Sequence, residues 1–268
     1  MKKYKLGILG IGNMGGSILS GIIKSSLYNK EEILLFDTDA NKVLKYKNDG
    51  FTFSKNEKDL IENVEMLLLA IKPQMLHVLK ENTYNIENLI VISIVAGKTI
   101  DDLKEIFKEQ LYVRVMPNTP ALINYGATAI SRTPNIDNET FNKVKQIFES
   151  IGMVREIDDN LMNEIIPING SMPAYLYYFV KAFIEKGVEN GIDYEVAKHL
   201  ATEAIIGSCK MIQETNKSID ELIKDVCSPK GATLEGLKVF EENNLDKIIK
   251  ETSDACIKRA YELSKLNN

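Results

Sequence analysis

Short, nearly continuous apolar runs alternate with amphipathic stretches from residue 4 to about residue 157. Such runs are typical of parallel strands buried on both faces, whereas strands with one solvated face alternate apolar and polar side chains. The segments between the runs have the length of crossover helices, which predicts a doubly wound α/β sheet. After a first strand ahead of Gly10, the expected strands are 33–36, 66–71, 89–95 and 112–116, with edge strands at 127–130 and 153–157 around a helix near 138–149.

The pattern changes in the second part of the chain, where strand-like runs disappear and helical spacing takes over. Apolar residues recur at intervals of three and four from Leu176 to Ile184, which predicts an amphipathic helix opened by Pro173. The stretch from Val196 to Ile212 is apolar almost all round. We therefore expect it to be buried on several sides, in part against a partner subunit. This contrast divides the chain into residues 1–159 and an all-helical part, residues 160–268.

A glycine-rich turn, Gly10-Ile-Gly-Asn-Met-Gly15, directly follows the first apolar run and precedes a helix-compatible stretch. A G-x-G-x-x-G signature between a strand and a helix is typical of dinucleotide-binding turns. Gly10 is expected to make the tight turn, Gly12 to let the backbone approach a pyrophosphate, and Gly15 to let the helix pack on the strand. Asp37 ends the next apolar run about 20 residues on, where a ribose-binding carboxylate belongs. A turn that binds nothing is therefore the weaker interpretation.

Two further strand ends carry polar residues, and ligands of such sheets bind outside the carboxyl ends of the strands. Lys72 is placed to meet cofactor phosphate or ribose, although taken alone a solvated lysine before a helix-opening proline is the simpler interpretation. Asn118 lies at the rim between two prolines; the alternative is a rigid turn in which Arg114 is only a structural ion-pair member. The expected cofactor-binding residues are Gly10, Gly12, Asn13, Met14, Gly15, Asp37, Thr38, Ala70, Lys72, Pro73 and Asn118.

The segment Cys227-Ser-Pro-Lys-Gly-Ala-Thr233 runs directly into a helix start. Unpaired backbone N–H groups and the helix dipole make such a start a site for anions, and Ser228 and Thr233 add hydroxyls without charge. This combination suits a small carboxylate, while an ordinary helix cap is an equally good interpretation of this stretch alone. A nucleophilic role for Cys227 is disfavoured because no histidine lies near it in sequence to act as a base.

Composition limits the partners and the compartment. The 268 residues are 44% hydrophobic and 26% charged with a net charge of −5, and the interspersed charges leave no basic patch for nucleic acid or an anionic membrane. Cys209, Cys227 and Cys256 are odd in number and widely spaced, and His77 and His199 are isolated, so neither a disulfide framework nor a metal site is expected. No stretch reaches the length of a membrane span, and the N-terminal apolar run is the glycine turn rather than a secretory signal. We therefore expect a cytoplasmic protein.

Taken together, these motifs make the sequence similar to pyrroline-5-carboxylate reductases along nearly its whole length. The resemblance rests on the glycine turn, Ala70–Pro73, Arg114–Ala121, Gly170–Tyr175 and Ser228–Thr233. It implies a dinucleotide-binding Rossmann domain, residues 1–159, and a helical substrate-binding and dimerisation domain, residues 160–268, that interlocks with a partner. The implied reaction is the reduction of the cyclic imine 1-pyrroline-5-carboxylate to L-proline by NAD(P)H, the last step of proline biosynthesis, in a homodimer or a larger assembly.

The resemblance also implies roles for the last loop. Ser228, Gly231, Ala232 and Thr233 would contact the substrate, holding its carboxylate through backbone N–H groups, with Thr233 and Ser228 as the catalytic residues. The Thr233 hydroxyl would reach the ring nitrogen, and the proton comes either from an already protonated imine or from a water held by Thr233. Three positions at or near the substrate motifs depart from the family, which usually has serine at Asn169, a small residue at Met172 and glycine at Lys230.

Two other functions are compatible with this architecture. A β-hydroxyacid or 6-phosphogluconate-type dehydrogenase would carry a catalytic lysine a few residues beyond a glycine-rich helix start, but the first lysine after Gly170 is Lys181. A non-catalytic dinucleotide-sensing dimer would need no substrate loop, and the segment Ser228–Thr233 argues against it.

The end of the second strand bears on the choice of cofactor. Arginine, whose planar fork matches phosphate, is absent before Arg114, and this strand ends in Asp37-Thr38 with Lys42 close by. Asp37 can accept hydrogen bonds from both ribose hydroxyls of NADH and would repel the 2′-phosphate of NADPH. Thr38 and Lys42 partly offset that repulsion, and Asp37 alternatively only caps the next helix. We expect NADH to be used at least as well as NADPH.

Overall fold

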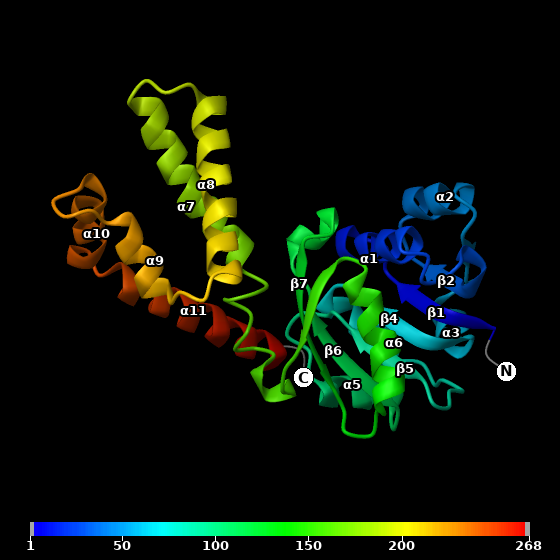
Figure 1. Ribbon diagram of the computed structural model, residues 1–268. Coiled ribbons are helices and arrows are strands. Elements are labelled where there is room, and N and C mark those ends of the chain that lie inside the picture. Colours follow the sequence, from blue (N-terminus) through cyan, green and yellow to red (C-terminus); the bar gives the residue numbers. More distant parts are fainter. Residues whose placement is uncertain (1–2, 266–268) are drawn as a thin grey trace. The chain divides into compact units, whose positions relative to one another are not determined.

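A computed structural model describes residues 3–265, in which eight strands form one sheet with the order β3-β2-β1-β4-β5-β6-β7-β8 (Figure 1). Neighbouring strands pair in parallel except β6 and β7, which are antiparallel. The strands are β1 (Tyr4–Leu9), β2 (Ile33–Phe36), β3 (Thr52–Phe53), β4 (Val64–Leu69), β5 (Ile90–Ser93), β6 (Leu111–Met116), β7 (Gly126–Arg132) and β8 (Gly152–Glu156). The doubly wound α/β class expected from the apolar runs is confirmed.

Two details of the sheet differ from the expectation. Strand β7 lies between β6 and β8, so β8 alone is an edge strand on this side. The short 3₁₀ helix η3 (Thr119–Ile123) returns the chain from β6 to β7 without a crossover helix, and a connection of this kind joins antiparallel strands. The opposite edge strand, β3, has only two residues and therefore leaves no apolar run to detect.

Six α-helices and three further 3₁₀ helices lie along the described part of the sheet unit before residue 162. They are α1 (Asn13–Lys24), η1 (Lys30–Glu32), α2 (Ala40–Asn48), α3 (Glu57–Glu62), η2 (Pro73–Met75), α4 (Leu76–Lys80), α5 (Ile100–Phe107), α6 (Asn138–Glu149) and η4 (Asp159–Leu161). One buried cluster joins α1 and α6 to the sheet through residues such as Ile18 and Val144. A second joins α3, α4 and α5 to the sheet through residues such as Leu60 and Phe107. Both faces are covered, which explains the unbroken apolar strands.

The rest of the described chain is helical. Its helices are α7 (Met172–Glu189), α8 (Tyr194–Glu214), α9 (Ile219–Val226), α10 (Ala232–Glu242) and α11 (Leu245–Lys265). Two compact units result: one contains the sheet through Pro173 together with the end of α11 from Cys256, and the other is Ala174–Ala255. Among residues 3–265, no helix combines the length and apolar character needed to cross a membrane.

The helical unit has a small core of its own. Val180, Ile184 and Ala197 form its buried cluster, with Ala201 and Ile205 packed against them. Along α8, large apolar side chains face outward, and Leu200 is 67% exposed. The stretch expected to be buried on several sides is thus covered by its own chain on one side only, at Ala197, Ala201 and Ile205. Exposed apolar surface of this extent is typical of an interface.

Candidate active site

The glycine turn between β1 and α1 has the geometry of an open cradle. Gly10 adopts φ +94°, and a side chain there would place its Cβ 2.6 Å from the carbonyl oxygen of Ala70. A Cβ on Gly15 would lie 2.1 Å from the carbonyl oxygen of Gly10, so the start of α1 packs directly on the turn. At Gly12 a Cβ would meet no atom within 4 Å. Two glycines are therefore required by packing, while Gly12 borders open space that a ligand can enter.

The first turn of α1 is available to an anion. Gly12 is its N-cap residue, with extended backbone and no side chain capping the helix. The backbone N–H of Gly16 donates to Gly12 O at 2.8 Å, so the donors ahead of it lack an intrahelical partner. Asn13 is exposed at the helix start, whereas Met14 packs partly against the core. A pyrophosphate fits such a helix N-terminus.

A cavity of about 340 Å³ opens beside this turn at the carboxyl ends of β1, β2 and β4. Six residues of the expected cofactor set line it: Gly10, Gly12, Asp37, Thr38, Ala70 and Lys72. Lys42, Glu57 and Met75 also line it. Of these, Glu57 and Met75 were not singled out from the sequence, because single residues on short helical turns leave no motif.

Asp37 is held firmly at the edge of this cavity. Its Oδ2 accepts the backbone N–H of Ile11 at 2.8 Å and its Oδ1 that of Asp39 at 2.9 Å, and its side chain is 9% exposed. The alternative that Asp37 caps the next helix is wrong, because the N-cap of α2 is Asp39, whose side chain accepts the N–H of Asn41. Each carboxylate oxygen of Asp37 keeps a further lone pair for a ligand hydroxyl.

Lys42 is the cation nearest to Asp37, and two carboxylates share its charge. Its Nζ lies 3.6 Å from Asp37 Oδ2 and 3.7 Å from Asp39 Oδ2. Two carboxylates therefore offset one ammonium group, and Glu57 adds another carboxylate to the cavity wall. Lys72 is the second ammonium group of the wall.

Five residues of the expected cofactor set do not line this cavity: Asn13, Met14 and Gly15 belong to the start of α1, and Pro73 and Asn118 lie elsewhere. Pro73 lines a separate hollow next to His77 and Lys98. Asn118 is buried, and its side chain is engaged by the protein: Oδ1 accepts the N–H of Ala127 at 2.9 Å, and Nδ2 donates to Asn169 Oδ1 at 3.3 Å. Direct cofactor contacts of all five residues stay predictions.

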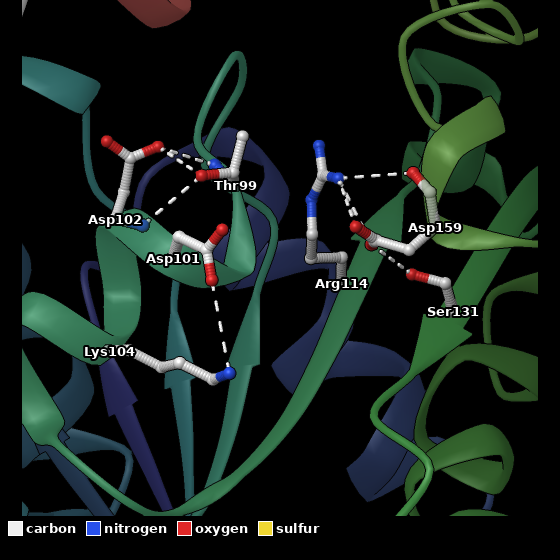
Figure 2. Close-up of polar contacts among 7 residues, drawn as sticks. All are labelled: Thr99, Asp101, Asp102, Lys104, Arg114, Ser131 and Asp159. Atoms are coloured by element: carbon white, nitrogen blue, oxygen red, sulfur yellow. Dashed lines mark hydrogen bonds and ion pairs between the residues drawn. The ribbon is translucent and has the colours of Figure 1, made fainter.

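Arg114 is a structural ion-pair member, the alternative considered from the sequence. Its Nη1 lies 3.0 Å from Asp159 Oδ2 and also donates to the Asp159 carbonyl oxygen at 3.4 Å (Figure 2). Ser131 on β7 donates its hydroxyl to Asp159 Oδ1 at 2.7 Å. The guanidinium is buried, so this cluster fastens the 3₁₀ helix η4 to strands β6 and β7.

The second group of expected site residues lies in the helical unit, in the turn after α9 and in the first residues of α10. The N–H of Gly231 donates to the Ser228 carbonyl oxygen at 2.9 Å, and Gly231 is the N-cap of α10 with no side chain capping the helix. A Cβ on Gly231 would lie 2.9 Å from the Ser228 carbonyl oxygen and 2.4 Å from Ser228 Oγ, so a side chain here would crowd the turn. Ser228 and Thr233 are both exposed. The first N–H groups of α10 are thus open to an anion.

Next to this loop lies an apolar hollow of about 360 Å³. Thr233 and Cys227 line it together with Met211, Leu222 and Leu237. Lys230, in the turn itself, adopts φ +59°, a left-handed conformation that glycine accepts without strain. An uncapped helix start beside an apolar wall and a hydroxyl suits a small ring that carries a carboxylate.

Two protein-family models match separate parts of the chain. Residues 159–263 match the family model of pyrroline-5-carboxylate reductase dimerisation. Residues 5–97 match the model described as NADP oxidoreductase, coenzyme F420-dependent.

Similarity to individual proteins extends over the full length. The chain is 31% identical to pyrroline-5-carboxylate reductase of Escherichia coli over 265 residues, covering 97% of this chain and 98% of the relative. It is 33% identical to the enzyme of the same name from Synechocystis over 263 residues, with coverage of 97% and 98%. Among solved structures, Plasmodium falciparum pyrroline carboxylate reductase with NADP bound has a TM-score of 0.88 at 28% identity, covering 98% of this chain and 99% of that chain.

Proposed function

The chain belongs to the pyrroline-5-carboxylate reductase family, and from this we infer that it is an NAD(P)H-dependent oxidoreductase that reduces 1-pyrroline-5-carboxylate to L-proline, the last step of proline biosynthesis. The observation that carries this conclusion is similarity at about 30% identity over 97% of the chain and 98% of the relatives. A match of that extent includes both the cofactor half and the dimerisation half. It favours this function over the dehydrogenase and sensor alternatives.

The residues of the sheet unit fit a dinucleotide. Bound there, the nicotinamide supplies the hydride that reduces the imine carbon. The open cradle at Gly12 and the uncapped first turn of α1 would hold the pyrophosphate, and Asp37 would accept the ribose hydroxyls. Lys72, in the cavity wall at the end of β4, would lie toward phosphate or ribose.

The loop ahead of α10 would hold the substrate. Backbone N–H groups of Ala232 and Thr233, in the first turn of an uncapped helix, would bind the carboxylate. The Thr233 hydroxyl would donate to the nitrogen of a neutral imine, accept the N–H of a protonated imine, or hold a water there, and Ser228 would support the carboxylate from the turn. A hydroxyl suits this task because it can both donate and accept.

We further propose that the cofactor cavity accepts NADH at least as well as NADPH. Asp37 is fixed by two backbone N–H groups, and the ammonium of Lys42 is shared between two carboxylates. A 2′-phosphate bound there would lie beside the carboxylate of Asp37, whereas two ribose hydroxyls would meet acceptors.

We propose that the helical unit forms a homodimer. Its own core comprises three buried residues, while Leu200 and Ile206 of α8 are 67% and 48% exposed. The match of residues 159–263 to the dimerisation model supports a second copy of this chain as the partner that buries these side chains.

A direct assay tests the proposed function. Purified protein is mixed with 1-pyrroline-5-carboxylate and NADH or NADPH, and loss of cofactor absorbance is followed together with L-proline formation; the reverse, proline-dependent reduction of oxidised cofactor at alkaline pH, is the complementary assay. Formation of one L-proline per cofactor oxidised is expected. Cofactor binding without turnover in either direction would contradict the function and favour the sensor alternative.

A further inference from the structure

The buried side chains of Asn118 and Asn169 form a chain of hydrogen bonds at the end of β6. The N–H of Ala127 donates to Asn118 Oδ1 at 2.9 Å, and Asn118 Nδ2 donates to Asn169 Oδ1 at 3.3 Å and to the Asn169 carbonyl oxygen at 3.4 Å. Asn169 Nδ2 in turn donates to the carbonyl oxygen of Met116 at 2.6 Å. Asn118 and Asn169 are 9% and 7% exposed. Each of the two amide groups therefore accepts one hydrogen bond and donates another. An aspartate at either position could only accept.

This chain of hydrogen bonds holds the loop that connects β6 to β7. Met116 is the last residue of β6, and Asn118 is the N-cap of η3. Asn169 holds the start of this loop, while Ser17 of α1 donates its hydroxyl to the carbonyl oxygen of Ala121 at 2.8 Å and holds its far end. The loop is thus pinned on two sides.

Sheet topology places this loop on the second half of the cofactor crevice. A dinucleotide spans the point where strand order reverses, which in this sheet lies between β1 and β4. Asp37 at the end of β2 marks the adenosine side. The ends of β4, β5 and β6 form the other side, where the nicotinamide half belongs.

We propose that Asn169 is a positioning residue for the nicotinamide end of the cofactor: it holds the Met116–Asn118 loop in the form that supports the ring. The proposal rests on the proposed function in that NAD(P)H is the ligand. Removal of the Asn169 side chain would take away the hydrogen bond to the Met116 carbonyl oxygen and leave Asn118 Nδ2 with only the backbone carbonyl oxygen of residue 169, so the loop would be held less firmly.

Binding measurements separate this role from general stability. Dissociation constants of NADH and of ADP-ribose, which lacks the nicotinamide, are measured by calorimetry for the unmodified protein and for Asn169→Ala. We expect the constant for NADH to rise about fivefold or more and that for ADP-ribose to stay within about twofold. In turnover, kcat should fall by about tenfold or more.

Asn163→Ala is the matched control. Asn163 is also a buried asparagine, 8% exposed, six residues upstream in the same segment, and its Oδ1 has no hydrogen-bond partner. This variant should lower thermal stability without changing the ratio of the two dissociation constants. Asn118→Ala removes the other amide and should reproduce the effect of Asn169→Ala, which provides a second test if Asn169→Ala folds poorly.

The outcomes are distinct. Equal weakening of NADH and ADP-ribose, or no weakening of either in both variants, would overturn the proposal. Failure of the unmodified protein to reduce 1-pyrroline-5-carboxylate would contradict the proposed function alone, because the binding comparison requires no substrate.

Discussion

The carboxylate of Asp37 accepts the backbone N–H of Ile11 at 2.8 Å, which joins the end of β2 to the glycine turn that follows β1. One side chain therefore both fixes the shape of the cradle and presents negative charge to the ribose. Replacing Asp37 would disturb the turn as well as the ligand contact. A test of cofactor choice is cleaner at its neighbour Thr38, which is exposed in the same cavity wall.

The unmodified protein should show a kcat/KM with NADH at least equal to that with NADPH. Thr38→Arg should shift the ratio toward NADPH by about tenfold or more, because a guanidinium adjacent to the ribose pairs with the 2′-phosphate. Thr38→Gln, similar in reach but uncharged, is the control and should leave the ratio near its original value. A strong preference of the unmodified protein for NADPH would mean that Asp37 does not select the ribose.

The sequence was sufficient for the doubly wound sheet and the cofactor turn because apolar runs and glycine spacing are local signals. The pairing of Asn118 with Asn169 could not be foreseen, because the two residues are 51 positions apart and neither belongs to a periodic pattern. Strand β3 was not predicted because its two residues leave no apolar run. Strand β7 was predicted, but as an edge strand; its place between β6 and β8 and its antiparallel direction depend on the connection, which carries no hydrophobic signal. The role of Asp39 as the cap of α2 escaped notice because Asp37 offered the same chemistry two residues earlier.

Asp102 gives the sheet unit a pH-dependent contribution to stability. Burial by itself raises the pKa of its carboxyl. The hydrogen bonds from the N–H and hydroxyl of Thr99 (Figure 2) and the charge of Lys98 lower the pKa by more than burial raises it, so the pKa lies below its usual 3.8. A lowered folded-state pKa stabilises the protein above the unfolded value, and the contribution is lost as the pH falls below about 4. Asp102→Asn should therefore lower the free energy of unfolding by about 1–3 kcal/mol at pH 7 and by less at pH 3.

Asp101 supplies the matched control for this experiment. It is the neighbouring acidic residue, and its side chain is 93% exposed. Its Oδ1 lies 3.9 Å from Lys104 Nζ (Figure 2). Asp101→Asn should change the free energy of unfolding in urea by less than about 0.5 kcal/mol. If the loss of unfolding free energy in Asp102→Asn stays constant from pH 7 to pH 3, the lowered pKa of Asp102 does not contribute to stability.

The exposed face of α8 predicts an obligate dimer. Leu200→Asp places a charge on that face without touching the core of the unit, so it should yield monomers in sedimentation velocity. Ile205→Asp is harsher, because Ile205 also packs against the core of its own chain, and should abolish the dimer or the fold. Leu44→Asp, at a residue that is 61% exposed on α2, is the control and should leave the assembly unchanged. An active monomer of the unmodified protein would refute the prediction.

Turnover of Thr233→Ala tests the central claim most directly. If the N-terminus of α10 holds the imine and the Thr233 hydroxyl serves its nitrogen, the variant should reduce 1-pyrroline-5-carboxylate at least about tenfold more slowly than the unmodified enzyme. The dissociation constant of NADH should be unchanged, and Thr233→Ser, which keeps the hydroxyl, should recover most of the rate. A kcat of Thr233→Ala equal to that of the unmodified enzyme would contradict the account.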